Sequence, residues 1–223
     1  MTDRNQTKYI PAFRYGWLTP FFDLFIRLTA PELTFKRRLV EEANIEKGHR
    51  VLDLGCGTAT LTIIIKELYP EAHVIGLDGD PKVLKIAQAK IAKTGLEIKL
   101  DQGMAFELPY PDNSFDRVLS SLLFHHLTRE NKVRTLEEVY RVLRPGGKLI
   151  IGDFGRPNNT AMYLISLVMR RLEETEDLIK GLLPEMLRRA GFDAVEDFTR
   201  YMMIFGTISL YRALKPPHVD KAT

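Results

Sequence analysis

The stretch RVLDLGCGTATLT at residues 50–62 constrains this chain more than any other. Residues 50–54 are a short run of mostly apolar side chains, which is typical of a buried parallel strand. The run ends at Gly55-Cys56-Gly57, where the chain can turn sharply because the two glycines carry no Cβ. Thr58 is placed to cap a following helix, whose apolar residues recur at helical spacing: Leu61, Ile64, Ile65 and Leu68. This succession predicts the ligand-binding unit of a doubly wound α/β fold.

The glycine turn differs from the one that binds dinucleotides. The dinucleotide fingerprint is GxGxxG, whereas this loop reads GCGTAT, so the third glycine is absent. Asp53, which we expect inside the turn, would repel a pyrophosphate and attract an ammonium group. Asp78 ends the next apolar run, HVIGLD, about 20 residues after the loop, at the spacing of a carboxylate that accepts ribose hydroxyls. These residues favour a ligand that carries a ribose and an ammonium group.

Four segments between residues 45 and 155 stand in the order and spacing of one known family. They are DLGCGT, GLDGDPKVLKIAQ, LPYPDNSFDRVLSSLLFHHL and VLRPGGKLIIGDF. Together they resemble the class I S-adenosylmethionine-dependent methyltransferases, most closely the small-molecule branch with the ubiquinone and menaquinone C-methyltransferases. The resemblance implies an α/β Rossmann-like fold: a seven-stranded, mostly parallel sheet with helices on both faces and an antiparallel last strand.

The same resemblance implies S-adenosyl-L-methionine as the cofactor, with S-adenosyl-L-homocysteine as the product. The residues expected to bind it are Asp53, Gly55, Cys56, Gly57, Thr58, Asp78, Gly79, Met104, Ala105 and Ser121. At Met104 the family usually has an Asp that accepts a hydrogen bond from the adenine amino group. Met104 can pack on the ring instead, and Ala105 can offer its amide, so we expect a somewhat looser affinity for the same cofactor.

Two adjacent histidines follow the fourth predicted strand, at the edge where open α/β sheets bind their ligands. His126, or His125, could remove a proton from a hydroxyl, an amine or an acidic carbon of the acceptor. The alternative is that one of the pair caps or packs, because His-His-Leu is frequent at this point of the superfamily whatever the substrate. Neither carboxylates nor histidines show the spacing of metal ligands, so no metal is expected.

The residues expected at the acceptor come from three places. An aromatic stretch at residues 11–30 can pack over the core, form a lid or wall of an apolar pocket, or lie as an interfacial helix in peripheral contact with a membrane. Asp153 ends the fifth predicted strand and could orient the acceptor, or anchor a loop. Residues 158–190 read as a helical insertion of the kind that lines acceptor pockets in this fold. The acceptor candidates are Tyr15, Trp17, Phe21, Asp153 and Tyr163.

The chain has 223 residues, which suits one α/β domain with additions. We divide it into an N-terminal aromatic helical lid segment (1–45), a methyltransferase domain (46–215, with the insertion at 158–190) and a disordered tail (216–223). The formal net charge of +3 is interspersed, which argues against a nucleic-acid partner. Cys56 is the only cysteine, so an internal disulfide is excluded. No signal peptide or membrane-length apolar run is present, so a cytoplasmic location is expected.

Several elements can be predicted with their inward faces. We expect a helix at 31–45, stopped by Gly48, with Leu33, Leu39, Val40 and Ala43 inward. We expect strands at 97–100, 117–120 and 148–153, the last after a tight turn at 144–147. Asp80 and Pro81 should open a helix as N-cap and first residue. A helix at 129–143 should bury Val133, Leu136, Val139, Tyr140 and Leu143, and 198–204 should pair antiparallel with 206–213.

The sequence therefore predicts an S-adenosylmethionine-dependent methyltransferase whose acceptor is a small apolar or amphipathic molecule, quinone-like or lipid-like. Two alternatives stay open: methylation of RNA or protein, and a catalytically inactive protein that only binds the cofactor. The oligomeric state is also left open.

Overall fold

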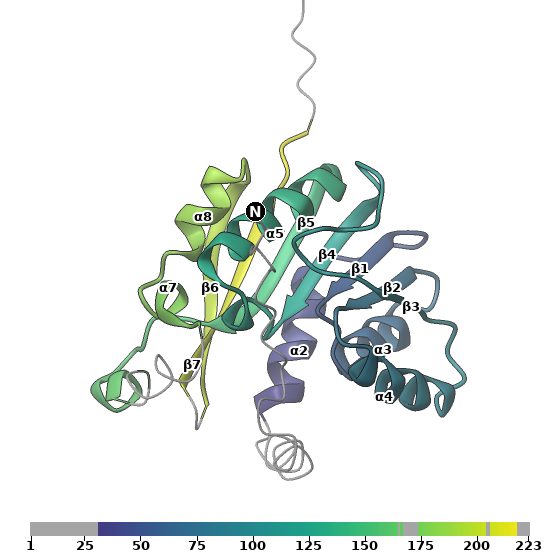
Figure 1. The fold of residues 1–223 in the computed structure, drawn as a ribbon, viewed down its shortest axis with the longest axis horizontal. Helices are drawn as coiled ribbons and strands as arrows, with labels where there is room; N and C mark the ends of the chain where they lie inside the picture. Colours follow the sequence, from purple (N-terminus) through teal and green to yellow (C-terminus); the bar gives the residue numbers. More distant parts are fainter. Residues whose placement is uncertain (1–30, 165, 167–173, 204–205, 218–223) are drawn as a thin grey trace, which may run out of the picture.

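The structure is a computed structural model that describes residues 31–164, 166, 174–203 and 206–217. Its centre is one seven-stranded sheet in the order β3-β2-β1-β4-β5-β7-β6, which runs from right to left in Figure 1. The first five strands are mutually parallel, whereas β7 is antiparallel to both of its neighbours. The predicted fold class is therefore confirmed. The strands are β1 (Arg50–Leu54), β2 (His73–Asp78), β3 (Lys99–Gln102), β4 (Phe115–Ser121), β5 (Leu143–Phe154), β6 (Asp193–Met203) and β7 (Gly206–Leu214).

The helices cover both faces of the sheet. Crossovers between parallel strands are right-handed, so helices that follow β1 and β2 lie on one face and the helix that follows β4 lies on the other. The contacts between elements agree with this arrangement. Helix α2 packs on α3, β4 and β5. Helices α5 and α7 pack on β5, and α8 packs on α5 and β6. The helices are α2 (Pro31–Glu42), α3 (Thr60–Leu68), α4 (Pro81–Ala92), α5 (Arg129–Val142), α7 (Glu176–Ile179) and α8 (Leu183–Arg189), with a short 3-10 turn, η1 (Phe124–His126).

Helix α2 belongs to the main core. Phe35 and Leu39 are fully buried, and the ring centroid of Phe35 lies 6.4 Å from that of Tyr201 on β6. The prediction that Leu33 points inward is wrong, because its side chain is 57% exposed. The helix also ends at Glu42, earlier than the predicted residue 45, and Gly48 lies beyond it in a turn with φ +76°.

Helix α5 faces the sheet in a way that apolar spacing did not reveal. Leu136 and Val139 are fully buried as predicted, but Val133 is 41% exposed and Leu143 already belongs to β5. The neighbour of Val133 takes the interior position: Lys132 is 1% exposed. A charged side chain at that position needs partners, which Asp177 on α7 and the carbonyl of Glu174, two residues before that helix, provide.

Three predicted boundaries shift. β3 runs from Lys99 to Gln102, two residues later than predicted, because it pairs with β2 from Ile75 to Asp78. β5 begins at Leu143 and includes the predicted turn at residues 144–147, where the ladder with β4 shifts register as a bulge. Thr58 does not cap α3; Ala59 holds that position, in a left-handed conformation and without a side-chain cap.

The region after β5 is partly helical, as predicted. Residues 160–164 are helical, and Pro184 lies in the first turn of α8, near the predicted start. The predicted antiparallel pair at the end of the chain is confirmed as β6 and β7. Within the described ranges, no helix combines the length and the apolar character that crossing a bilayer requires.

Candidate active site at the carboxyl edge of the sheet

The glycine loop between β1 and α3 is folded against the end of β2. The backbone N–H groups of Gly55 and Cys56 both donate to the carbonyl of Leu77, at 2.8 and 3.0 Å. Gly55 has φ +71°, and a Cβ there would lie 2.8 Å from Cδ1 of Leu123, just after β4. Gly57 has φ +54°, and a Cβ there would meet nothing within 4 Å. The first glycine therefore allows close packing, whereas the second borders open space.

Asp78, the last residue of β2, fixes this loop. Its Oδ2 accepts a hydrogen bond from the N–H of Gly57 at 2.9 Å, and its Oδ1 accepts one from the N–H of Asp80 at 2.9 Å. Asp80 in turn accepts from the N–H of Lys82 at 2.8 Å, so the predicted N-cap of α4 is confirmed. The two carboxylates thus have distinct roles: Asp80 caps α4, and Asp78 holds the glycine loop against the end of β2.

Asp53 is buried in β1 beneath the loop. The expectation that it lies inside the turn is wrong, because its side chain is 1% exposed and its Oδ2 accepts from Oγ1 of Thr62 on α3 at 2.6 Å. Burial raises the pKa of Asp53 from 3.8 to about 6, and the hydrogen bond from Thr62 opposes this rise. The sequence does not point to Thr62, because a threonine inside an apolar helix belongs to no recognisable motif. Cys56 is also buried, and burial raises the pKa of its thiol.

The loop after β3 covers Gly79. The N–H of Gly103 donates to the carbonyl of Asp78 at 3.1 Å, and a Cβ on Gly79 would lie 2.9 Å from Sδ of Met104. Met104 is half-buried, and the neighbouring Ala105 is buried. Met104 therefore takes up the space beside the end of β2, where we expected it to contact a nucleoside.

Ser121 ends β4 with an unsatisfied hydroxyl. Its Oγ is buried and has no hydrogen-bond partner among the described residues. A buried hydroxyl without a partner is rare in folded proteins and usually faces a water or a ligand. Ser121 therefore extends the group formed by the glycine loop, Asp78 and Met104 along the carboxyl edge of the sheet.

The two histidines lie in η1, directly after β4, and their environments differ. His125 is 8% exposed, and its Nδ1 lies 2.9 Å from Oδ1 of Asp153. His126 is half-buried, with its ring centroid 4.0 Å from that of His125. The hydrogen bond to Asp153 fixes the orientation of His125 and directs its Nε2 away from the carboxylate.

Asp153 is held by hydrogen bonds within the fold. It is fully buried, and it accepts hydrogen bonds from the N–H groups of Phe124 at 2.7 Å and Phe154 at 2.8 Å as well as facing His125. Its contacts with His125 and these two amides hold its pKa below the ordinary value despite burial. Of the two roles predicted for Asp153, the structure agrees with the loop anchor, because Asp153 fixes the turn that carries His125; contact with the acceptor stays a prediction.

The remaining acceptor candidates are not gathered by the described structure. Tyr163 lies in the helical residues 160–164 and is 53% exposed. Tyr15, Trp17 and Phe21, with the lid prediction for residues 1–30, lie outside the described residues.

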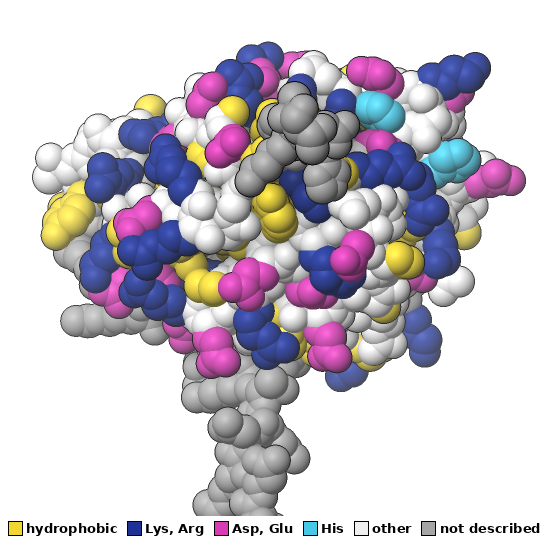
Figure 2. Space-filling view, turned by 90° about the horizontal axis from the view of Figure 1, so that it is seen from above, with side chains coloured by type: hydrophobic (Ala, Val, Ile, Leu, Met, Phe, Trp, Pro, Cys, Tyr) yellow, Lys and Arg dark blue, Asp and Glu magenta, His cyan; other side chains and the backbone are white. Residues whose placement is uncertain are grey.

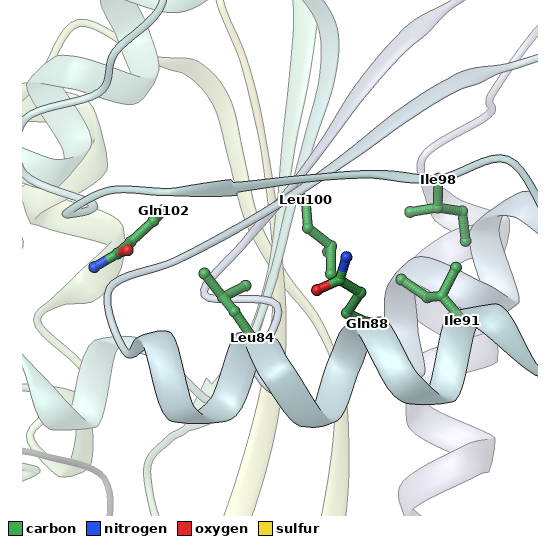
Figure 3. Close-up of a pocket in the computed structure, with 6 residues that line it drawn as sticks. All are labelled: Leu84, Gln88, Ile91, Ile98, Leu100 and Gln102. Atoms are coloured by element: carbon green, nitrogen blue, oxygen red, sulfur yellow. The ribbon is translucent and has the colours of Figure 1, made fainter.

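Two hollows elsewhere on the surface include no predicted site residue. One, of about 290 Å³, lies between α4 and the edge strand β3 (Figure 3), and is lined by Leu84, Gln88, Ile91, Ile98, Leu100 and Gln102. The other, of about 820 Å³, lies at the amino edge of the sheet, near Arg50, His73 and Lys99, which begin or adjoin strands. Figure 2 looks onto that edge and shows basic and acidic side chains side by side.

The residues of the loop fit a nucleoside with a cationic, amino-acid-like end. The buried carboxylate of Asp53 lies under the loop, the space over Gly57 is open, and the hydroxyl of Ser121 lacks a partner. Within the described ranges, no group of three or more His, Cys, Asp or Glu side chains could hold a metal ion. The sheet order, the reversed β7 and this glycine loop are those of the Rossmann-like methyltransferase class.

Comparisons with known proteins agree. A family model described as a methyltransferase domain matches residues 51–147. The demethylmenaquinone methyltransferase of Thermus thermophilus is 37% identical over 210 residues, which cover 90% of this chain and 94% of that protein. Two solved structures share the fold at 18% identity. The YcgJ protein of Bacillus subtilis has a TM-score of 0.67 over 82% of this chain and 98% of its own. Phosphoethanolamine N-methyltransferase 2 of Haemonchus contortus, in complex with S-adenosyl-L-methionine, has a TM-score of 0.66 over 82% and 52%.

The chain therefore belongs to the S-adenosylmethionine-dependent methyltransferases, in the branch of the demethylmenaquinone methyltransferases. Its methyl donor is S-adenosyl-L-methionine, and the predicted family, enzyme class and cofactor are confirmed.

Proposed function

We propose that the protein transfers the methyl group of S-adenosyl-L-methionine to a ring carbon of a reduced, quinone-like acceptor such as a demethylmenaquinol. The observation that carries this proposal is the 37% identity to a demethylmenaquinone methyltransferase along nearly the whole of both chains. The predicted alternatives, methylation of RNA or protein and an inactive binding protein, have no comparable support.

The proposed donor-binding residues are those of the loop and of the strand ends around it. Asp78 receives the ribose hydroxyls, Asp53 favours the ammonium group by its charge, and Gly55 and Gly57 let the backbone approach. Met104 and Ala105 border the adenine, and Ser121 supplies the hydroxyl that lacks a partner. Cys56, Thr58 and Gly79 complete the wall. When bound, the donor supplies an electrophilic methyl group on a sulfonium.

The protein's chemical task on the acceptor is to move a proton. A hydroquinone carbon becomes strongly nucleophilic when the neighbouring hydroxyl loses its proton, and His125 is proposed to accept that proton at Nε2. Asp153 holds Nδ1 at 2.9 Å, which favours the tautomer with Nε2 free to accept and stabilises the imidazolium that results. The acceptor carbon takes the methyl group as the S–C bond of the donor breaks. The ring then loses its C–H proton to solvent, and the imidazolium of His125 returns its proton to the oxygen, which restores the aromatic hydroquinone and the free base.

Three variants test this assignment against a short-chain demethylated naphthoquinol, kept reduced, with release of S-adenosyl-L-homocysteine as the readout. We expect His125→Gln to lower kcat at least 100-fold, the usual loss for a general base, and Asp153→Asn to lower it about 10-fold or more. His126→Gln is the matched control for the neighbouring ring and should stay within a few-fold of wild type. The oxidised quinone, RNA and lipid should give no product. Wild-type turnover of RNA but not of the quinol would refute the proposed acceptor, and full activity of His125→Gln would refute the proposed base.

A further inference from the structure

Lys132 is a buried lysine that the proposed chemistry does not use. It lies in the first turn of α5, seven residues after His125, and only 1% of it is exposed. Burying an ammonium group is costly unless it is paired and hydrogen-bonded, and an apolar side chain of similar size would usually be no less stable. Its presence at an interior position therefore calls for a specific role.

Among the described residues, Lys132 has its partners in α7 and just before it. Its Nζ donates to the carbonyl of Glu174 at 2.5 Å and lies 3.6 Å from Oδ2 of Asp177. Asp177 is itself buried, and it also pairs with the exposed Arg129 at 3.3 Å. Lys132 thus joins α5 to a stretch more than 40 residues further along the chain.

Glu174 is also bound from its other side. Its N–H donates to the carbonyl of His125 at 3.1 Å, while its own carbonyl accepts from Lys132. The backbone of this one residue therefore bridges η1, which carries the proposed base, and α5. Any change in the position of the segment entering α7 would pull directly on the backbone of His125.

The charges around His125 come from four elements. Asp153 on β5 is bonded to it and His126 lies beside it in η1, whereas Lys132 on α5, paired with Asp177 on α7, is linked to it through the backbone of Glu174. Tyr211 on β7 is fully buried; burial, and to a smaller extent the charges of Asp197 and Asp153, raise the pKa of its hydroxyl. Burial lowers the pKa of Lys132, and the charges of Asp177, Asp153 and Glu174 oppose that effect. Lys132 and Asp153 thus interact electrostatically, and Asp153 is the partner of His125.

We propose that Lys132 is a positioning residue that holds Glu174, two residues before α7, against the turn carrying His125. The inference rests on the proposed role of His125 as the base. It assigns one effect to Lys132: its hydrogen bond to the carbonyl of Glu174 fixes where His125 stands relative to the acceptor.

Two substitutions test this hydrogen bond. Lys132→Met removes the donor, whereas Lys132→Gln keeps a donor for the carbonyl of Glu174. Arg129→Met is the matched control, because it removes the other cation bound to Asp177 from an exposed position. Each variant is assayed for thermal stability, for affinity for S-adenosyl-L-methionine by calorimetry, and for acceptor KM and kcat.

We expect Lys132→Met to raise the acceptor KM about 10-fold, the cost of a charged hydrogen bond, while donor affinity stays within 2-fold. Lys132→Gln should recover most of the acceptor KM. Arg129→Met should leave KM unchanged.

A role in folding alone gives a different pattern. It would lower thermal stability, donor affinity and turnover together, and that result would overturn the inference. If Lys132→Met is unfolded and no longer binds the donor, Lys132→Gln decides: an acceptor KM that rises only in step with a loss of donor affinity overturns the inference. Failure of the proposed function looks different again, because wild type itself would then lack quinol turnover or His125→Gln would keep it.

Discussion

The buried carboxylate of Asp53 should lower the stability of the folded chain and strengthen donor binding. Burial raises its pKa from 3.8 to about 6. One pKa unit corresponds to about 1.4 kcal/mol, so an ionised Asp53 should destabilise the folded chain by about 3 kcal/mol once the pH exceeds both values. Replacing it with Asn keeps the shape and an acceptor for Oγ1 of Thr62, but removes the charge. We therefore expect Asp53→Asn to be more stable than wild type at neutral pH.

The sign and the pH window follow from the raised value. Below pH 3.8 the carboxyl is protonated in both the folded and the unfolded chain, so it contributes no pH dependence. Between pH 3.8 and about 6 the unfolded chain ionises Asp53 first, so wild type loses stability relative to Asp53→Asn as the pH rises. Above about pH 6 the difference should level off near its maximum.

Urea unfolding without donor, at pH 4.5, 6 and 7.5, measures this difference, since the other titrating groups cancel between the two proteins. The free energy of unfolding of Asp53→Asn minus that of wild type should grow by roughly 2 kcal/mol across the series. Thr62→Val, which removes the hydrogen bond that opposes the rise, should enlarge the pH dependence. Calorimetry should show about 10-fold weaker donor binding by Asp53→Asn. A difference that stays flat from pH 4.5 to 7.5 would refute the argument from burial.

Two further substitutions, each with a matched control, test the glycine loop. Gly55→Ala should destabilise the folded chain by about 2–4 kcal/mol and abolish donor binding, because φ is +71° and the new Cβ would lie 2.8 Å from Leu123. Gly95→Ala is its control, since φ there is +69° and a Cβ would meet nothing within 4 Å. It should lower the free energy of unfolding in urea by only about 1 kcal/mol and leave donor affinity unchanged. Asp78→Asn should weaken donor binding about 10- to 100-fold by calorimetry, because it disturbs the bond to the N–H of the loop. Asp80→Ala should cost about 1 kcal/mol of stability and little affinity, and equal losses of affinity in the two Asp variants would contradict the separate roles.

The donor half of the site could be predicted because its information is local. The glycine loop, Asp78 and the N-cap at Asp80 lie within 30 residues, and backbone geometry alone fixes where each must stand. The error at Thr58 has a local cause too: the chain needs a left-handed residue at Ala59 to enter α3, which moves the helix start beyond the expected cap. Asp53 was misplaced because the sequence does not show which face of β1 it takes.

The acceptor half could not be predicted in the same way. Asp153 and His125 are 28 residues apart, and Lys132 and Glu174 are 42 apart. Apolar spacing placed Val133 inward on α5, yet the interior position belongs to Lys132, because its partners arrive from a distant segment that supplies a carbonyl and a carboxylate. Periodicity counts apolar residues, so it fails where a buried charge is paired across elements.

This division has a chemical reason. A donor that is always the same molecule can be held by a short, fixed loop, whereas the acceptor side must be built to suit its substrate. The described structure meets that demand with one backbone residue, Glu174, bound by both the turn of His125 and the helix of Lys132. Glu174 and the turn of the proposed base are therefore linked through one backbone. A sequence change that moves Glu174 should reposition the proposed base as well, so acceptor affinity and catalytic rate should vary together.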